Sequence, residues 1–248
     1  MIPIQPLVDA LSDAITAARH GAKEKGVHRL RVTTRRLDTW LRLAEMRVLR
    51  DDLRWLRSLA GPVRDLDILL SDPLYAPLRQ APIDGGTDRL AQLRGLRAES
   101  LAQLHAALQD SRVAGLCTAL ALLPPVPVRR AVRSTRRLLR RVRRLEMDAS
   151  RPNEIHDGRR AVRRLRFALE LLGNPVPGLV ELQDVLGRVS DLTLPTRLDL
   201  SLALGPTAGP DLEVALNQAV ATWTSHQPTL EAIERWISSC SDTQPPSA

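Results

Sequence analysis

Two short stretches of the chain decide its fold. Residues 28–37 read HRLRVTTRRL and residues 156–165 read HDGRRAVRRL, with a histidine, three arginines and a leucine repeated at an offset of 128 residues. In an α-helix, positions i, i+3 and i+7 lie on one stripe, so His28, Arg31 and Arg35 face the same way. The sequence therefore predicts two helices that each carry a cationic stripe with a histidine. A stripe of this kind can hold a chain of phosphates.

The opposite faces of both helices are apolar, and Arg36 falls at the edge of the first cationic stripe. The expected core positions of the first helix are Leu30, Leu37, Trp40, Leu41, Ala44 and Val48. Those of the second helix are Ala161, Leu165, Ala168, Leu169 and Leu172. This two-sided pattern is typical of a helix that packs one face on a core.

Helical periodicity continues along the rest of the chain, and no run alternates as a half-buried strand does. The sequence predicts an all-α fold with helices over residues 6–20, 27–48, 51–69, 87–109, 112–123, 129–144, 153–172, 178–192, 212–224 and 229–239. Gly61-Pro62 is expected to bend or interrupt its helix. The proline- and glycine-rich segment 70–88 is expected to be a loop.

A second pair of repeated segments extends the similarity between the two parts of the chain. GPVRDL at 61–66 recurs as GRVSDL at 187–192, each one helix after a signature stretch. This order predicts an internal duplication with a pseudo-two-fold relation. In that arrangement the two stripes could face each other across a shared groove, a step that goes beyond what the spacing alone shows. Asp65 and Asp191 are expected to orient arginines, with metal ligation as the alternative.

We expect one domain over residues 1–240. Its halves cover about 1–123 and 129–240, with a proline-rich segment between them, and a disordered tail follows at 241–248.

The charge of the chain favours an anionic partner. The sequence has 36 lysines and arginines against 28 acidic residues, a net charge of +8, and only Lys23 and Lys25 are lysines. Arginine binds phosphate through a planar fork, although codon bias can also account for the ratio. The most basic segment, 129–144, contains nine arginines and no acidic residue. It is either a solvated face or a phosphate contact, and the best candidates for contact are Arg133, Arg136, Arg137 and Arg140.

Several classes of protein lack support in the sequence. Cys117 and Cys240 form no metal-ligand or redox spacing, and no Walker loop, dinucleotide motif or HExxH occurs. Neither a signal peptide nor a membrane span is evident, so we expect a cytoplasmic protein without a bound metal or cofactor. The pair His156-Asp157 is a weak hint of metal-dependent phosphohydrolysis. Aromatic residues make up only 2% of the chain, which disfavours base stacking.

The paired His-x-x-Arg-x-x-x-Arg-Arg-Leu elements resemble those of the CHAD family, the conserved histidine α-helical domain. The segments GPVRDLDILL (61–70) and LQDVLGRVSDL (182–192) resemble the family's elements that follow each signature helix. The resemblance implies two four-helix-bundle halves around a basic groove or pore, binding of inorganic polyphosphate, association with polyphosphate granules, and no catalytic activity of its own.

Carried over by motif, the resemblance implies one set of binding residues. These are His28, Arg31, Arg35, Arg36, His156, Arg159, Arg163 and Arg164. The two histidines could instead be structural. Alternative functions are binding of a nucleic-acid backbone, hydrolysis of polyphosphate, and recruitment of an acidic protein, for example one of polyphosphate metabolism.

Overall fold

The computed structural model describes residues 1–20, 24–80, 88–197 and 208–242, and the fold is helical. Within these residues the only β-type pairing is an isolated bridge between Ile2 and Val126. The all-α prediction is confirmed.

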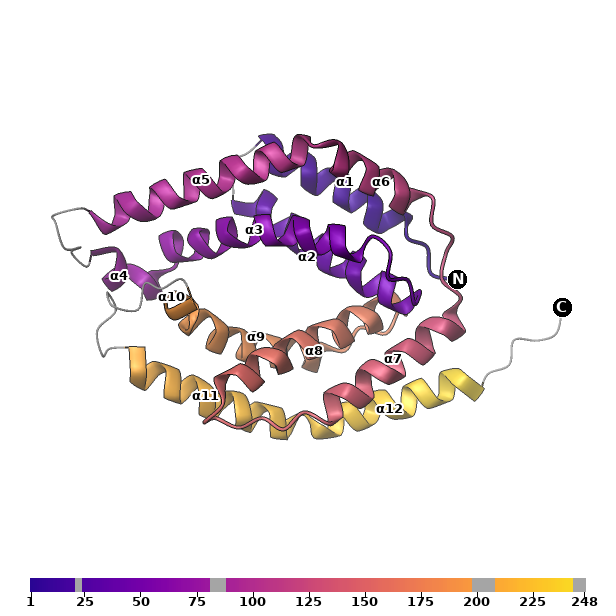
Figure 1. Ribbon diagram of the computed structural model, residues 1–248. Helices are drawn as coiled ribbons and strands as arrows, with labels where there is room; N and C mark the ends of the chain where they lie inside the picture. Colours follow the sequence, from indigo (N-terminus) through magenta and orange to yellow (C-terminus); the bar gives the residue numbers. More distant parts are fainter. Residues whose placement is uncertain (21–23, 81–87, 198–207, 243–248) are drawn as a thin grey trace.

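The helices form two stacks, one from each part of the chain (Figure 1). The first stack contains α1 (Gln5–His20), α2 (Glu24–Leu43), α3 (Arg50–Ser71), the 3-10 turn η1 (Pro73–Tyr75), α4 (Ala76–Gln80), α5 (Arg89–Gln109) and α6 (Ser111–Ala121). The second contains α7 (Val128–Arg143), α8 (Pro152–Leu171), α9 (Pro177–Leu192), α10 (Leu194–Arg197), α11 (Ala208–Ser225) and α12 (Gln227–Asp242). The signature helices α2 and α8 lie on the inner side of their stacks, with α3 and α9 beside them. The internal duplication itself stays a prediction.

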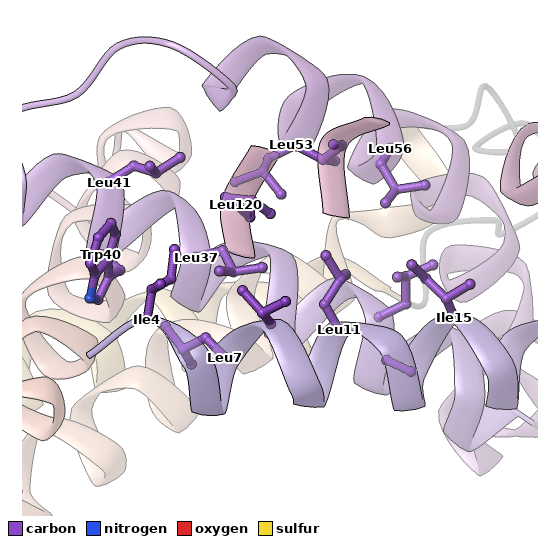
Figure 2. Close-up of a cluster of buried hydrophobic side chains, with 14 of the residues drawn as sticks. Ile4, Leu7, Leu11, Ile15, Leu37, Trp40, Leu41, Leu53, Leu56 and Leu120 are labelled. Carbon is purple, nitrogen blue, oxygen red and sulfur yellow. The ribbon is translucent and has the colours of Figure 1, made fainter. Parts of the chain in front are cut away.

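Each stack has its own aliphatic core, and Figure 2 shows the first. Leu11, Leu37 and Trp40 are completely buried there. The Trp40 indole Nε1 donates a hydrogen bond to the carbonyl of Ile2 at 3.3 Å. Ile2 pairs in turn with Val126, in the proline-rich segment between the halves. A buried leucine contributes roughly 1.5–3 kcal/mol, so the fold draws its stability from these cores.

The predicted core faces of the signature helices are confirmed apart from two positions. Leu165 and Leu169 are inaccessible to solvent, as are Leu30 and Leu37. Leu172 is only partly buried and packs against both cores. Val48 was expected in the core but is 74% exposed.

The reason is that α2 ends at Leu43 rather than at residue 48. The Met46 amide donates to the Leu41 carbonyl at 2.9 Å and the Glu45 amide to the Arg42 carbonyl at 3.1 Å. This pair of bonds is the Schellman ending, which places the residue at the position of Glu45 in the left-handed region. Glu45 has φ 61°, a conformation that glycine adopts more readily.

The segment 70–88 is not simply a loop, contrary to the sequence prediction. It contains η1 and α4, and Tyr75 and Leu78 are buried in a third apolar cluster that also includes Leu194 of α10. The Tyr75 hydroxyl donates to the carbonyl of Asp191. This cluster joins the two stacks at the end of the molecule away from α7 (Figure 1). Residues 81–87 lie outside the described part of the chain.

Two further boundaries differ from the sequence prediction. Helix α3 runs without interruption through Gly61-Pro62, because Pro62 lies on an exposed face where the loss of one backbone hydrogen bond is tolerated. Helix α12 includes Ser241 and Asp242, which were assigned to the tail. The remaining tail residues, 243–248, lie outside the described part.

Candidate anion-binding groove

A basic groove lies between the two stacks and consists of two adjoining pockets. Their volumes are about 390 and 470 Å³, and both are lined by Arg31 and Arg35 of α2 and by Arg160 and Arg163 of α8. Among the described residues, the arginines that line the groove are Arg31, Arg35, Arg42, Arg54, Arg57, Arg64, Arg159, Arg160, Arg163 and Arg164. The acidic residues that line it are Asp38, Asp65 and Asp191. Cations therefore greatly outnumber carboxylates in the groove.

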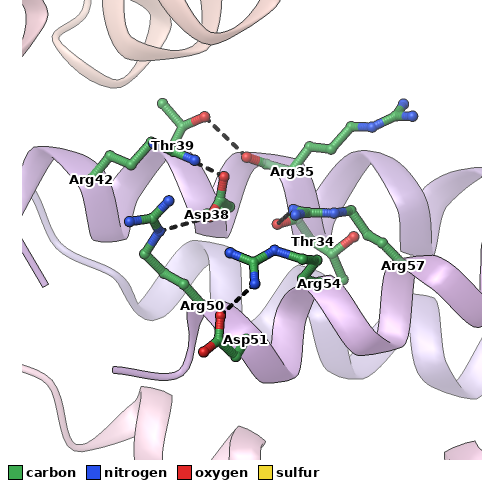
Figure 3. A network of polar contacts seen from close by, with 9 residues as sticks. All are labelled: Thr34, Arg35, Asp38, Thr39, Arg42, Arg50, Asp51, Arg54 and Arg57. Atoms are coloured by element: carbon green, nitrogen blue, oxygen red, sulfur yellow. Dashed lines mark hydrogen bonds and ion pairs between the residues drawn. The ribbon is translucent and has the colours of Figure 1, made fainter. Parts of the chain in front are cut away.

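Two of the cations that line both pockets of the groove are held by no ion pair with a described residue. The guanidinium groups of Arg35 and Arg163 form no hydrogen bond or ion pair with another described residue, and Arg35 extends away from its neighbours in Figure 3. Burial, together with the charges of Arg31 and Arg159, lowers the pKa of Arg35 to about 9. Burial and the charges of Arg35 and Arg159 lower the pKa of Arg163 to about 8.

Guanidinium groups hold their protons in proteins. We therefore interpret these lowered pKa values as the electrostatic cost of crowding charged arginines from both halves into one partly buried space. An anion that enters the groove removes this cost.

Other arginines are fixed by the protein itself, and Figure 3 shows this network on α2 and α3. Asp38 is buried and accepts from Arg42 at 3.1 Å and from Arg50 at 3.0 Å. Burial by itself raises the pKa of Asp38, but the two arginines outweigh it and the pKa is lowered overall. Arg57 donates to the backbone carbonyl of Thr34 at 3.2 Å. These contacts hold the wall of the groove in place.

Arg31 is held against α3 by three acceptors. Its Nη1 donates to the carbonyls of Gly61 at 2.6 Å and Ala60 at 3.5 Å and to Asp65 Oδ1 at 3.2 Å. The prediction that Asp65 orients an arginine is therefore confirmed. On the other side, a Cβ at Gly187 would lie only 3.2 Å from the Nη2 of Arg159. Gly187 thus lets a signature arginine lie close to the following helix, whereas a Cβ at Gly61 would make only ordinary contact with Arg31, at 3.8 Å.

Asp191 lines the same pocket as Arg159, and its pairing with that arginine stays a prediction. No group of three or more histidine, cysteine and acidic side chains that could hold a metal ion occurs within the described residues.

The two signature histidines line one pocket of the groove, as the sequence predicted. Burial and the charges of Arg64 and Arg35 lower the pKa of His28. His156 Nδ1 lies 3.4 Å from the Ser190 hydroxyl of α9. Both rings can therefore present a donor to an anion in the groove.

The sequence profile of the CHAD domain matches residues 4–198. The chain belongs to the CHAD family. Two solved structures are similar to it over nearly their whole length. The crystal structure of the CHAD domain from the plant Ricinus communis has 24% sequence identity and a TM-score of 0.61, with 98% of this chain and 91% of that chain covered.

The structure of PptA from Streptomyces chartreusis has 19% identity and a TM-score of 0.60, with 93% and 95% covered. At these identities the likeness shows the fold alone. A comparison with curated proteins gave no match.

One predicted site residue of this CHAD domain lies outside the groove. Arg36 pairs with Glu170 of α8 at 2.7 Å and stacks 5.3 Å from the centre of the Phe167 ring. Glu170 also forms an ion pair with Arg166, whose Nε lies 3.4 Å from Glu170 Oε1. Arg36 therefore connects the two halves rather than lining either groove pocket.

The four candidates on α7 also lie outside the two groove pockets. Arg137 donates to Glu45, and Arg136 donates to the Ile237 carbonyl of α12 at 3.4 Å. Arg133 and Arg140 are exposed. Helix α7 has no acidic residue of its own. For Arg137 the acidic partner is Glu45, in the turn after α2.

Several groove residues were missed by the sequence analysis. They are Arg42, Arg54, Arg57, Arg64 and Arg160. A signal was present, because Arg57 and Arg64 are seven residues apart and Arg54 is three before Arg57, the spacing of one helical face. No helix within the described residues is long and apolar enough to cross a membrane.

Proposed function

We propose that this CHAD domain binds inorganic polyphosphate in the groove and does not hydrolyse it. The observation that carries the proposal is the pair Arg35 and Arg163, two partly buried cations from opposite halves whose guanidinium groups form no ion pair or hydrogen bond with a described residue. A phosphate chain carries regularly spaced negative charges and no bases. Arginine forks on rigid helices suit such a ligand because their geometry is set before binding.

The lining of the groove favours polyphosphate over a nucleic acid. Among the described residues that line it, Phe167 is the only phenylalanine, tyrosine or tryptophan. That ring is already stacked with Arg36 and Arg166. Proteins that bind single-stranded nucleic acids usually offer aromatic platforms to the bases. Binding of polyphosphate would also bring the protein to polyphosphate granules in the cytoplasm.

The test is calorimetric titration with long-chain polyphosphate at two salt concentrations, beside an RNA of matched charge. We expect wild-type affinity to fall with salt, because bound cations release counterions. The variant Arg35→Glu/Arg163→Glu should lose binding. The control Arg94→Glu/Arg235→Glu changes the net charge equally at two exposed positions on α5 and α12 and should retain it.

Equal behaviour of the two double variants would contradict the groove as the site. Stronger binding of RNA than of polyphosphate would put the nucleic-acid function first. Release of phosphate from polyphosphate in the presence of Mg²⁺ or Mn²⁺ would contradict the non-catalytic part of the proposal.

A further inference from the structure

A second basic cleft adjoins the groove beside α7. It has a volume of about 440 Å³, and its cations are Arg42, Arg47, Arg50 and Arg137. We call it the α7 cleft. Arg42 lines both the α7 cleft and the groove. The two spaces therefore lie next to each other on either side of one arginine.

The α7 cleft contains a carboxylate of the protein itself. Glu45 accepts from Arg137, and its Oε1 lies 3.5 Å from the Ser134 hydroxyl. The hydrogen bond from Arg137 lowers the pKa of Glu45, and the charges of Arg130 and Arg133 lower it further. The cleft thus has a positive potential, and an anionic group already occupies it.

The backbone at Glu45 has a conformation that residues other than glycine seldom adopt. Glu45 ends α2 in the left-handed region, with φ 61°. Gly173, at the same offset of 128 residues as the signature, ends α8 in the same way with φ 78°. Glycine is the usual residue at this position of a Schellman ending. The first half therefore carries a glutamate where the second half carries the residue that fits the backbone best.

Cations also connect the cleft to the groove along α7. The charges of Arg130, Arg133 and Arg137 act on Glu45, and the charge of Arg141 acts on Arg164 in the groove. Positions 130, 133, 137 and 141 form one stripe of a helix. From Arg130 to Arg141 the stripe covers about 16 Å, at 1.5 Å per residue.

We propose that the α7 cleft is a second subsite for a phosphate chain that extends out of the groove, and that the Glu45 carboxylate occupies it until phosphate replaces it. This inference rests on the proposed function and adds a dependence on chain length. When phosphate enters, Arg137 exchanges the Glu45 carboxylate for phosphate oxygens. Short chains fill the groove alone, where Arg35 and Arg163 form no ion pair with a described residue.

The same helix offers a matched control. Arg143 donates to Glu234 of α12, which is an arginine–glutamate pair of the same kind and similarly exposed, but it lies outside the α7 cleft. Exposed pairs of this kind contribute little to stability, so all four residues can be replaced without loss of the fold.

The experiment measures the affinities of Glu45→Gln and Glu234→Gln for tripolyphosphate and for long-chain polyphosphate. Glu45→Gln should bind the long chain about two- to fivefold more tightly than wild type, the range expected from the loss of one exposed charge. Its affinity for tripolyphosphate should not change. Glu234→Gln should change neither affinity, although it alters the net charge equally. Glu45→Gly, which relieves the backbone, should behave as Glu45→Gln does.

Replacement of Arg137, the partner of Glu45, gives an independent measurement. Arg137→Gln should weaken binding of the long chain and reduce the slope of log affinity against log salt by about 1, since one phosphate contact is lost. Arg143→Gln should leave that slope unchanged.

Identical behaviour of the two glutamate variants, with both ligands still bound, would overturn the second subsite but not the groove. If the affinity of wild type did not depend on the length of the phosphate chain, the second subsite would also be overturned. Failure of wild type to bind tripolyphosphate or the long chain at all would instead reject the proposed function. If Arg137→Gln weakened RNA but not polyphosphate, the cleft would be a nucleic-acid contact.

Discussion

Replacement of Arg163 by glutamine should stabilise the free protein while it weakens polyphosphate binding. A pKa lowered from the ordinary arginine value to about 8 corresponds to about 6 kcal/mol of unfavourable interaction for the charged form, at 1.36 kcal/mol per pKa unit. The main causes are burial and the charges of Arg35 and Arg159. No hydrogen bond or ion pair with a described residue offsets this interaction, so we expect the charged side chain to destabilise the free fold.

Only part of this cost is removed by the substitution. The glutamine amide is also polar and loses some hydration in the groove. The remaining arginines keep their mutual repulsion, which water in the groove screens. We therefore expect Arg163→Gln to raise the free energy of unfolding by about 1–3 kcal/mol. The melting temperature should rise by about 2–4 °C per kcal/mol for a chain of this size.

The assay is urea and thermal unfolding in a buffer without multivalent anions. The matched control is Arg160→Gln, because Arg160 also lines the groove but is exposed and pairs with Asp157 at 2.5 Å. Its effect should stay within about 0.5 kcal/mol. A ligand that binds the folded state raises stability more when it binds more tightly. Added polyphosphate should therefore stabilise wild type more than Arg163→Gln, which binds it more weakly. A loss of stability in Arg163→Gln, in the absence of anions, would refute the reasoning.

Three further residues, namely His28, Gly187 and Gly26, give testable predictions. In the free folded protein the pKa of His28 is lowered from its ordinary value of 6.5. The unfolded chain therefore binds more protons than the folded protein, and the stability of the protein should fall as the pH drops below 6.5. A bound polyanion raises this pKa, so calorimetry should show polyphosphate binding that tightens from about pH 7.5 to about pH 5.5, less so in His28→Gln. Gly187→Ala places a Cβ 3.2 Å from the Arg159 guanidinium and should weaken polyphosphate binding severalfold in the same titration, with little change in melting temperature. Gly26→Ala places a Cβ 2.7 Å from the backbone carbonyl oxygen of Ala17 and should lower the free energy of unfolding by about 1–3 kcal/mol, measured with urea.

Much of the fold could be predicted from the sequence because its periodicity is strong and its signature is repeated. The stripe of His28, Arg31 and Arg35 lies in one pocket, as the i, i+3, i+7 spacing requires. The role of Asp65 was also predictable, since its partner Arg31 lies one helix earlier in the chain. These predictions depend on local geometry, which the sequence encodes directly.

Contacts between distant segments were harder to predict. Arg36 has the same residue type and motif position as a groove arginine, yet Glu170, which lies 134 positions later in the chain, draws it into a bridge between the halves. Glu45 was not singled out, because the Schellman ending that places it beside Arg137 depends on where α2 stops. Nothing in the local pattern of α7 shows that its arginines meet acidic side chains of other helices.

The arrangement of partners separates two roles among the arginines of the groove. Arg31 and Arg42 are held by carboxylates of the protein, and Arg57 is held by a backbone carbonyl. Their positions are fixed before any ligand arrives, which reduces the ordering cost of binding. Arg35 and Arg163 have no such contacts with described residues and carry the largest electrostatic cost. A fold whose stability comes from two aliphatic cores can bear this cost, and an anion that relieves it gains affinity from the strain that the free protein holds.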